Sequence, residues 1–380
     1  MMRGHVRKRG TKWAIVFDFG VSLEGKRKQK WVSGFSTKKE AESALTKALT
    51  DVNNGEYTSP STQTVNEFFH NWAIDKQAQV RQSTWRSYKW TIDYHILPNI
   101  GKLTLKDLKP ETVQKMYSKI RNQTRQDGKS DTLSERSILH VHLILKNALD
   151  RAVRWGLISR NPCDLVEAPR PRKVEMTIWT MDQVRQFLKE SEREPQYIVF
   201  LLLLTTGMRI GEVLGLRWRD ILFEERKITV RQQISFVKGG YVVQEPKTRA
   251  SKRSIPIPNE VIQALIKHKL SQDIRKNFFG EEYAMQADLV CCTDKGTPYY
   301  HGNLNAKWAK IIQRAGLTRI RIHDARHTHA SLLLQQGANP KIVQERLGHA
   351  NIGITLDTYT HLLPGIQEQA IDEFAKRFFK

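Results

Sequence analysis

Two proline-containing stretches interrupt the chain and limit what it can fold into. The first is Thr58-Ser59-Pro60-Ser61-Thr62, and the second is Ala168-Pro169-Arg170-Pro171-Arg172-Lys173. Proline lacks a backbone N–H and its ring clashes with the preceding turn, so neither stretch can lie inside a helix. A chain of 380 residues also exceeds what one hydrophobic core usually serves. We therefore expect three domains, over residues 1–57, 63–167 and 175–380.

The first part of the chain has the pattern of a small β-sheet followed by one helix. Residues 12–19 and 28–35 are rich in aromatic and β-branched side chains and are separated by glycines, as in a β-hairpin. Thr37-Lys38-Lys39-Glu40 is a capping box, which opens a helix that runs to about Val52. We expect a three-stranded sheet with this helix beside it.

The second part has the spacing of an all-helical domain. Apolar side chains recur three and four residues apart, which is the period of a helix with one buried face. The periodic positions are Val65, Phe68, Phe69, Trp72, Trp85, Tyr88 and Ile92, and then the stretch from residue 133 to 155.

The third part mixes helices with short strands. A second capping box begins at Thr180, and the apolar run 197–204 indicates a buried helix. Strands are expected at 227–234, 241–244 and 253–257. The fold class is thus a multidomain chain, mainly α with small β-sheets, whose last domain is mixed α/β.

The charge of the chain indicates a polyanionic partner. There are 62 Lys and Arg residues against 39 Asp and Glu, a difference of +23. A surplus of this size favours nucleic acid or an acidic membrane surface, and the longest apolar run is too short to cross a bilayer. The N-terminus has no apolar core of a secretory signal. We expect a cytoplasmic, DNA-associated protein.

Exposed basic side chains near aromatic residues are the candidate DNA contacts. Their alternative interpretation is a solvated, charged surface, which is the commoner reason for such runs. The candidates are Arg7, Lys8, Arg9, Lys26, Arg27 and Lys28 in the first part and Arg81, Arg86, Lys89, Arg136 and Arg154 in the second.

Three short clusters in the third part carry reactive side chains. Arg209 follows an apolar helix and a glycine, with Glu212 three positions on as a candidate partner. His323 and Arg326 are also three residues apart and share a helical face. His349 precedes Tyr359, whose polar surroundings alone would indicate a solvent-facing tyrosine. Together, arginines, histidines and a tyrosine can transfer a phosphoryl group without a metal, because cations neutralise the phosphate and histidines move protons.

These clusters resemble the conserved boxes of the tyrosine recombinase, or phage integrase, family. The resemblance assigns Arg209 to the first arginine box, His323 and Arg326 to the His-x-x-Arg box, and His349 to the Leu-Gly-His box. It makes Tyr359 the nucleophile and Lys247, in a Pro-Lys-Thr setting, the hairpin-loop lysine, with Lys252 as a weaker candidate. Glu212 would support the arginine. Ala325 stands where the family commonly has leucine.

The resemblance implies a DNA strand transferase that needs no cofactor or metal. Tyr359, assisted by His323, would attack a phosphodiester and form a 3′-phosphotyrosine with a free 5′-hydroxyl. Lys247 would serve as the general acid. The enzyme would integrate and excise a mobile element, either a temperate phage or an integrative conjugative element.

The same resemblance implies particular partners. An arm-binding first domain and a core-binding second domain would recognise double-stranded attachment sites. The protein would act as a homotetramer on DNA, with an excisionase and a host DNA-bending protein as candidate partners. The C-terminal segment 365–380 places Ile371, Phe374 and Phe378 near one helical face, either for packing on its own chain or for docking on a neighbouring protomer.

Three other interpretations compete with this one. A zinc site formed by His323, His327, His329, His349 and His361 is disfavoured because Arg326 lies inside the cluster. The three cysteines lack the spacing of a zinc module or a disulfide framework, so we expect buried thiols. A type IB topoisomerase would share the chemistry, and a catalytically idle DNA-binding regulator would share the fold.

Overall fold

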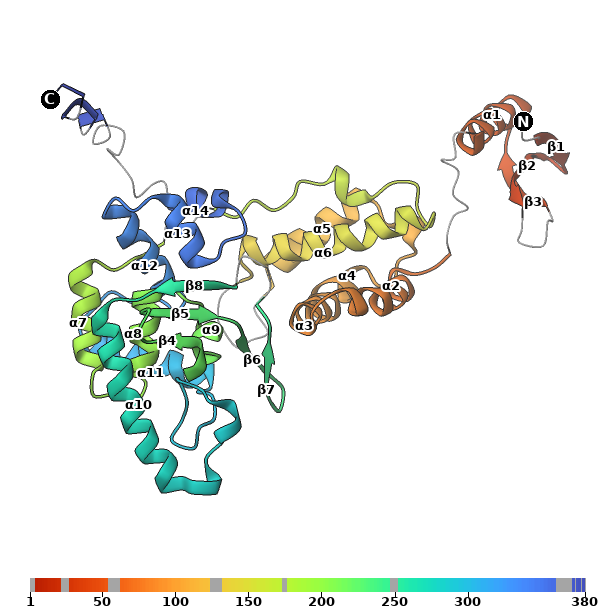
Figure 1. Cartoon of the computed structure of the whole chain (residues 1–380). Helices are drawn as coiled ribbons and strands as arrows, with labels where there is room; N and C mark the ends of the chain where they lie inside the picture. The colour runs from red at the N-terminus through yellow and green to blue at the C-terminus, as the bar shows by residue number, and fades with distance from the viewer. Residues whose placement is uncertain are drawn as a thin grey trace. The chain divides into compact units, whose positions relative to one another are not determined.

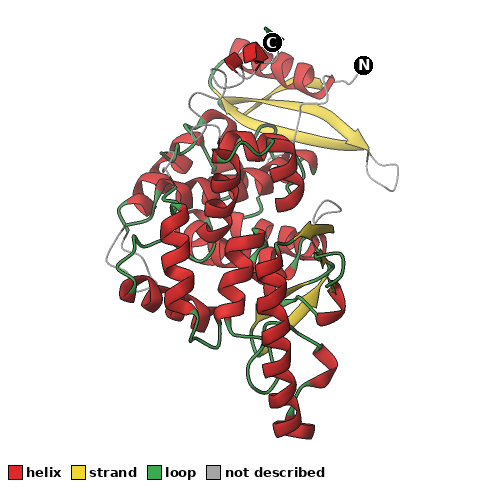
Figure 2. Ribbon diagram, turned by 60° about the vertical axis from the view of Figure 1, so that its left-hand side comes forward, coloured by secondary structure: helices red, strands yellow, loops and turns green. Residues whose placement is uncertain are grey.

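The computed structural model describes residues 4–21, 27–53, 62–123, 132–172, 176–246, 252–359, 371–372, 374–376 and 378–379. The chain divides into two compact units, Met1–Lys173 and Val174–Lys380. Figure 1 labels the helices and strands of both. Helices predominate in both, and the strands of the described residues form small antiparallel sheets (Figure 2). The expected fold class is confirmed. Among these residues no helix is long and apolar enough to cross a membrane.

The first unit begins with the expected three-stranded sheet and helix. Strands β1 (Gly4–Arg9), β2 (Lys12–Val21) and β3 (Arg27–Phe35) pair in the order β1-β2-β3, and α1 (Lys38–Asn53) follows. Ile15 and Phe17 alternate along β2 and pack with Ala41 of α1 in one apolar cluster. The Thr37 hydroxyl accepts a hydrogen bond from the Glu40 N–H at 3.2 Å, as a capping residue does.

The rest of the first unit is helical, as its periodicity predicts. Its helices are α2 (Val65–Gln79), α3 (Gln82–Thr91), the π-helical turn η1 (Ile92–Ile96), α4 (Leu97–Ile100), α5 (Pro110–Arg121) and α6 (Glu135–Arg154). The periodic residues Val65, Phe68 and Trp72 are buried in one core with the inner face of α6. Trp85 packs against that core, whereas Trp90 is 46% exposed.

The second unit contains helices around two short sheets. Its helices are α7 (Met181–Ser191), α8 (Tyr197–Thr206), α9 (Ile210–Leu214), α10 (Asn259–Phe279), α11 (His301–Arg314), α12 (Asp324–Gln335), α13 (Pro340–Leu347) and α14 (Ile352–Tyr359). Its strands are β4 (Ile221–Leu222), β5 (Lys227–Val230), β6 (Gln233–Val237), β7 (Gly240–Gln244) and β8 (Arg253–Pro256). The capping box at Thr180 is formed in full with Gln183.

One expected strand was wrong. Residues 227–234 do not form a single strand, because β5 pairs with β4 and β8 while β6 pairs with β7 in a separate sheet. The break falls at Arg231 and Gln232, and the Gln232 side chain donates a hydrogen bond to the Gly215 carbonyl at 2.9 Å. That long-range contact has no counterpart in a local β pattern.

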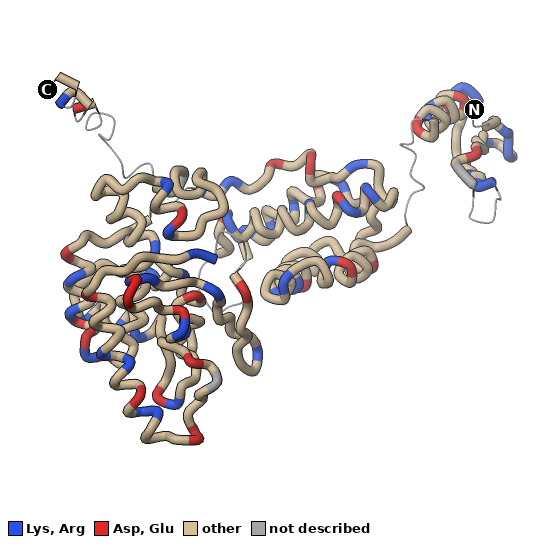
Figure 3. The backbone as a smooth tube through the Cα atoms, viewed as in Figure 1, with Lys and Arg blue, Asp and Glu red and all other residues tan. Residues whose placement is uncertain are grey.

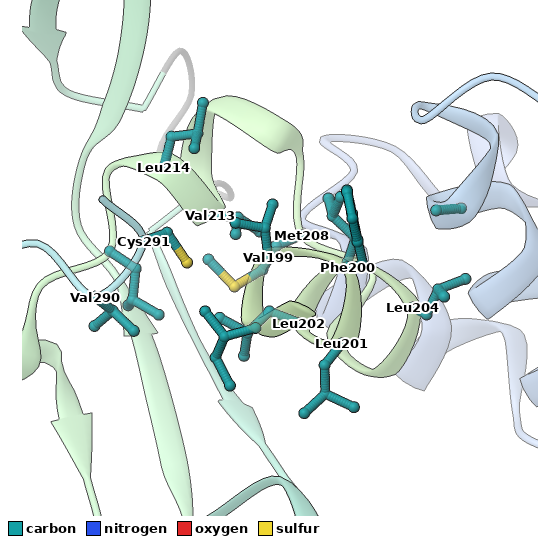
Figure 4. Packing of buried hydrophobic residues seen from close by; sticks show 14 of the residues in the cluster. Val199, Phe200, Leu201, Leu202, Leu204, Met208, Val213, Leu214, Val290 and Cys291 are labelled. Carbon is teal, nitrogen blue, oxygen red and sulfur yellow. The ribbon is translucent and has the colours of Figure 1, made fainter. Parts of the chain in front are cut away.

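Helix α8 is the centre of the second unit's core. Every residue from Ile198 to Leu204 is at most 7% exposed, so this helix has no polar face (Figure 4). The apolar run therefore is the buried helix that was expected.

Cys163, Cys291 and Cys292 are free, buried thiols, as predicted. Helices α8 and α12 pack together, as do α12 with α13 and α13 with α14, and the reactive clusters lie on these helices or directly beside their ends.

Candidate active site

A glycine at the end of α8 positions the first arginine. Gly207 has φ +67°, and a Cβ added there would lie 2.7 Å from His329 Cδ2, so only glycine fits without a shift. Two residues later Arg209 lies in extended conformation directly before α9. Its side chain is 35% exposed, which leaves part of the guanidinium open to a ligand.

Glu212 holds this arginine, as its spacing suggested. Glu212 Oε1 accepts a hydrogen bond from Arg209 Nη1 at 2.8 Å, and Oε2 accepts one from the Arg209 backbone N–H at 2.9 Å. The carboxylate is 1% exposed. Burial favours a raised pKa for Glu212, but hydrogen bonds and charge from Arg253, and then from Arg209, hold its pKa below the ordinary value.

Arg253 is a second partner of Glu212 that the sequence analysis missed. Arg253 Nη2 lies 2.9 Å from Glu212 Oε2, and Arg253 Nε donates to the Arg346 carbonyl at 2.6 Å. Arg253 thereby ties β8 to α9 and α13. Since Arg253 lies 41 positions after Glu212, no local spacing in the sequence points to the pair.

Replacing Glu212 by Gln is expected to destabilise the second unit. The substitution removes a buried charge that neutralises Arg209 and Arg253, and breaking such a pair typically costs ~3–5 kcal/mol. Because the pKa of Glu212 is lowered in the fold, its contribution is present above pH ~4.5 and is lost as the pH falls further. Thermal unfolding at pH 7 and pH 4 measures the effect. An equal melting temperature for both proteins at pH 7 would contradict it.

Arg326, which belongs to the second reactive cluster, forms hydrogen bonds to backbone close to the other two. It is 4% exposed and donates from Nη1 to the Gly207 carbonyl at 2.7 Å and from Nη2 to the Leu347 carbonyl at 2.6 Å. A guanidinium has five N–H donors, so three remain for a ligand. Burial, and then the charge of Arg209, lower the pKa of Arg326 to about 9, which leaves it charged at neutral pH.

His349 follows Gly348, which ends α13 in the left-handed region at φ +67°. Its Nδ1 lies 2.9 Å from the Thr355 hydroxyl, and its carbonyl accepts a hydrogen bond from Gln344 Nε2 at 2.8 Å. Burial, and then the charges of Arg326 and Arg209, lower the pKa of His349 to about 4. His349 is therefore a neutral imidazole close to both arginines.

Tyr359 is not the solvent-facing residue that its local sequence suggests. It ends α14 and is 1% exposed, packed with Ala330, Val343 and Leu347. Burial raises the pKa of Tyr359 to about 12, although the Arg326 charge lowers it in part. Polar neighbours in sequence gave no sign of this burial, because α12 and α13 supply the apolar contacts.

The hydroxyl of Tyr359 lies 2.7 Å from His327 Nδ1. In the sequence His327 was considered only as a candidate zinc ligand. His323, which was expected to assist Tyr359, precedes α12 as an exposed residue, and its ring lies edge-on to that of His327 with centroids 5.4 Å apart. Burial, and then the charge of Arg326, lower the pKa of His323.

Lys247 lies outside the described residues. The weaker candidate, Lys252, is described and forms an ion pair with Glu245 at 2.9 Å. Its side chain is 54% exposed.

His329 has a structural role. Its Nδ1 lies 2.9 Å from the Leu204 carbonyl and must donate to it, so Nε2 is free to accept the hydrogen bond from Arg346 Nε, also at 2.9 Å. Burial, and then the Arg346 charge, lower the pKa of His329 to about 3. Within the described ranges, no three His, Cys, Asp or Glu side chains lie where they could jointly hold a metal ion.

Acid is expected to destabilise the second unit before its carboxylates titrate. His327, His329 and His349 all have lowered pKa values, so the unfolded chain binds more protons than the folded one below pH ~6.5. Stability is therefore present above that pH and is lost towards pH 4. His329 alone is expected to lower the melting temperature by roughly 3–5 °C per pH unit in this window. Replacing His329 by Asn should give a shallower slope, and a melting temperature that stays constant from pH 7 to 4.5 would contradict the account.

The candidate DNA contacts of the first unit are exposed wherever the structure describes them. Figure 3 marks the Lys and Arg positions along the backbone in blue. In the register of the sheet, Arg7 pairs with Ala14 and Trp31 with Val16, on the face of β2 opposite to the α1-facing residues. The Arg7 guanidinium lies 5.9 Å from the half-exposed Trp31 ring.

The remaining candidates differ in their surroundings. Lys8 lies over the Trp13 ring at 6.0 Å, and Lys89 pairs with Asp93 at 3.0 Å. Lys26 lies outside the described residues. The other exposed candidates are Arg9, Arg27, Lys28, Arg81, Arg86, Arg136 and Arg154.

In the C-terminal segment Ile371, Phe374 and Phe378 are exposed. The rings of Phe374 and Phe378 stack with centroids 5.2 Å apart.

Three known families match consecutive parts of the chain. The phage integrase family matches residues 178–365, the phage integrase N-terminal SAM-like domain matches 64–121, and the arm DNA-binding domain matches 5–52. The reactive clusters all lie within the first of these matches.

Similar proteins include a "Tyrosine recombinase XerC-like" protein of Caldanaerobacter subterraneus subsp. tengcongensis, 29% identical over 95% of each chain. The ICEBs1 integrase of Bacillus subtilis is 28% identical over 74% of this chain and 73% of its own. The solved structure of the Tn1549 transposon integrase with transposon right end DNA is 23% identical. It has a TM-score of 0.69 and covers 84% of this chain and 100% of its own. That likeness shows a shared fold.

Proposed function

Since the chain belongs to the phage integrase family and is a site-specific recombinase of the tyrosine type, we propose that Tyr359 is its nucleophile. The observation that carries the proposal is the set of contacts made by Arg326. Its guanidinium binds the carbonyls of Gly207 and Leu347, next to Arg209 and His349, while the following residue contacts the Tyr359 hydroxyl. One arginine thus brings the three clusters to one site.

In the cleavage step, Tyr359 Oη attacks a DNA phosphorus and displaces the 5′ oxygen. The products are a 3′-phosphotyrosine and a free 5′-hydroxyl. Arg209 and Arg326 stabilise the charge that develops on the nonbridging oxygens, assisted by a hydrogen bond from His349. Lys247 gives a proton to the departing oxygen, a contribution that is typically worth ~10²–10⁴ in rate.

Rejoining is the same step in reverse. The phosphotyrosine bond conserves the energy of the broken phosphodiester, so a 5′-hydroxyl from another duplex can displace Tyr359 without ATP or a metal ion. Recombining two duplexes requires four strand cuts, and each protomer supplies one tyrosine. The active assembly is therefore a homotetramer on DNA, acting at the attachment sites of a mobile element in the bacterial cytoplasm.

Residues 1–57, 63–167 and 175–380 form the arm-binding, core-binding and catalytic domains of this enzyme. The exposed Arg7–Trp31 pair supports the first assignment, since a cation and an aromatic ring on an open sheet face suit a DNA groove. An excisionase and a host DNA-bending protein would set the direction of the reaction.

Deletion of residues 1–57 is expected to leave cleavage of a core site within roughly threefold of the full chain and to reduce integration by about 10²-fold or more, because only arm contacts are lost. Cleavage of an isolated core site and integration between two plasmids are measured side by side. Unchanged integration would contradict the arm-binding role.

A plasmid assay distinguishes recombination from topoisomerase activity. The protein is incubated with two plasmids that carry the attachment sites, with and without a chelator. We expect cointegrates only when both sites are present, with equal yield in the chelator. Relaxation of any supercoiled plasmid without joining of the two sites would instead support a type IB topoisomerase.

A further inference from the structure

Two adjacent residues of α12, Arg326 and His327, contact different parts of the active site. Successive helical residues point about 100° apart. Arg326 points to the Gly207 and Leu347 carbonyls, whereas His327 points to α14, where its Nδ1 lies 2.7 Å from Tyr359 Oη. The imidazole and phenol rings are tilted by 52° with centroids 5.8 Å apart. The reacting oxygen therefore has a specific nitrogen partner before DNA is present.

We propose that His327 accepts the Tyr359 proton during strand cleavage and returns it when the strands are rejoined. The proposal rests on the function above, in which Tyr359 is the nucleophile. As the Oη–P bond forms and the P–O5′ bond breaks, the phenol proton passes to His327 Nδ1. The 5′ oxygen receives its own proton from Lys247. In the reverse step the imidazolium of His327 gives the proton back to Tyr359 Oη, so neither residue is consumed.

The groups around His327 keep it neutral until the reaction begins. On its own helix it faces His323, Asp324 and Arg326, and Arg321 lies just before the helix. Tyr359 faces it from α14, and His349 is also near enough to interact with it. Burial, and then His323, lower the pKa of His327 to about 4, although Asp324 opposes this shift. A neutral imidazole has one nitrogen that can accept a hydrogen bond.

The proton stays on the tyrosine in the resting protein, because the pKa of Tyr359 is raised to about 12. Attack on phosphorus changes this balance. The phenol oxygen becomes acidic as it bonds to phosphorus, and negative charge that develops on the phosphate favours the imidazolium form of His327. Transfer therefore accompanies bond formation, which is general base catalysis.

His323 is the alternative acceptor and provides the matched control. It lies four residues before His327, at the N-terminal cap of α12, and is exposed, whereas His327 is half-buried. Its ring contacts the His327 ring, and His327 in turn contacts the Tyr359 hydroxyl. His323 therefore lies behind His327 as seen from the reacting oxygen. Replacing either histidine by Asn keeps a hydrogen-bonding group near the Nδ1 position but removes the base.

The experiment measures single-turnover cleavage from pH 6 to 9 by the full chain. The substrate is an attachment site whose scissile 5′ oxygen is replaced by sulfur. Sulfur is a good leaving group without a proton, so we expect this substrate to restore cleavage to Lys247→Ala and to isolate activation of the nucleophile. With His327→Asn we expect a rate ~10²–10⁴ lower at pH 7 and rising about tenfold per pH unit, because the variant must use tyrosinate. The wild type should have a flat profile. His323→Asn should also have a flat profile at whatever rate it reaches, because His327 is still present to accept the proton.

Two results would overturn the proposal: a flat profile for His327→Asn within roughly threefold of the wild-type rate, or a rising profile for His323→Asn instead. Absence of a covalent adduct from the wild type would refute the proposed function itself. If His327→Asn does not fold, the protonation of His327 can be measured in the wild-type chain instead. In histidine-labelled protein, ¹⁵N NMR should show His327 Nδ1 without a proton and shifted by Tyr359→Phe, whereas a protonated Nδ1 would overturn the inference.

Discussion

Replacing Tyr359 by Phe is expected to abolish covalent attachment to DNA while leaving the fold and DNA binding intact. Removal of a nucleophile typically lowers the rate by a factor on the order of 10⁶. The cost in stability is small by comparison, since the ring still fills its site among Ala330, Val343 and Leu347. The substitution removes only the hydrogen bond to His327, which is worth ~1 kcal/mol.

The assay is detergent-resistant adduct formation on a nicked attachment site, with DNA affinity and melting temperature measured in parallel. The control for a tyrosine outside the active site is Tyr241→Phe. Tyr241 lies on β7 and is 40% exposed, so this variant should form adduct as the wild type does. Adduct formation by Tyr359→Phe, or loss of adduct in Tyr241→Phe, would contradict the assignment of the nucleophile.

Replacing Arg326 by Lys is expected to impair both catalysis and folding. One ammonium cannot reproduce the two hydrogen bonds that the guanidinium makes to the Gly207 and Leu347 carbonyls while also holding a phosphate. Loss of a preorganised donor in an active site typically costs ~10²–10³ in rate. An unsatisfied buried carbonyl costs ~1–3 kcal/mol, so we expect a reduction of that size in the free energy of unfolding.

Arg209→Lys separates the two effects. The Arg209 side chain is 35% exposed and makes its ion pair at the edge of the site, so lysine should preserve stability within ~1 kcal/mol while the cleavage rate still falls by ~10²-fold or more. Single-turnover cleavage and urea unfolding of both variants test the comparison. Equal stability of Arg326→Lys and the wild type would show that Arg326 does not connect the three clusters.

The sequence predicted those parts of the fold whose causes are local. Capping side chains, helical periodicity and the uniformly apolar run at 197–204 are each readable from neighbouring residues, and the corresponding helices are present. The strand at 227–234 was wrong: it is broken at Arg231 and Gln232, where Gln232 contacts Gly215, and a local pattern does not include a contact between residues 17 positions apart.

In the active site, too, local patterns were predicted and long-range contacts were not. Motif resemblance indicated Arg209, His323, Arg326, His349 and Tyr359, but spacing could not show which histidine contacts the tyrosine. His323 and His327 lie one helical turn apart, so periodicity does not distinguish them. Arg253 was missed for a related reason, since its partners Glu212 and Arg346 are brought to it only by the folded sheet and helices.

The central claim is tested most directly by locating the covalent bond to DNA in the wild-type protein. The adduct formed on a nicked attachment site is digested with trypsin and nuclease, and the nucleotide-bearing peptide is sequenced by mass spectrometry. We predict a nucleotide joined through its 3′-phosphate to Tyr359, with a free 5′-hydroxyl on the other DNA end. A nucleotide on any other residue, or a 5′-phosphate linkage to the protein, would contradict the account.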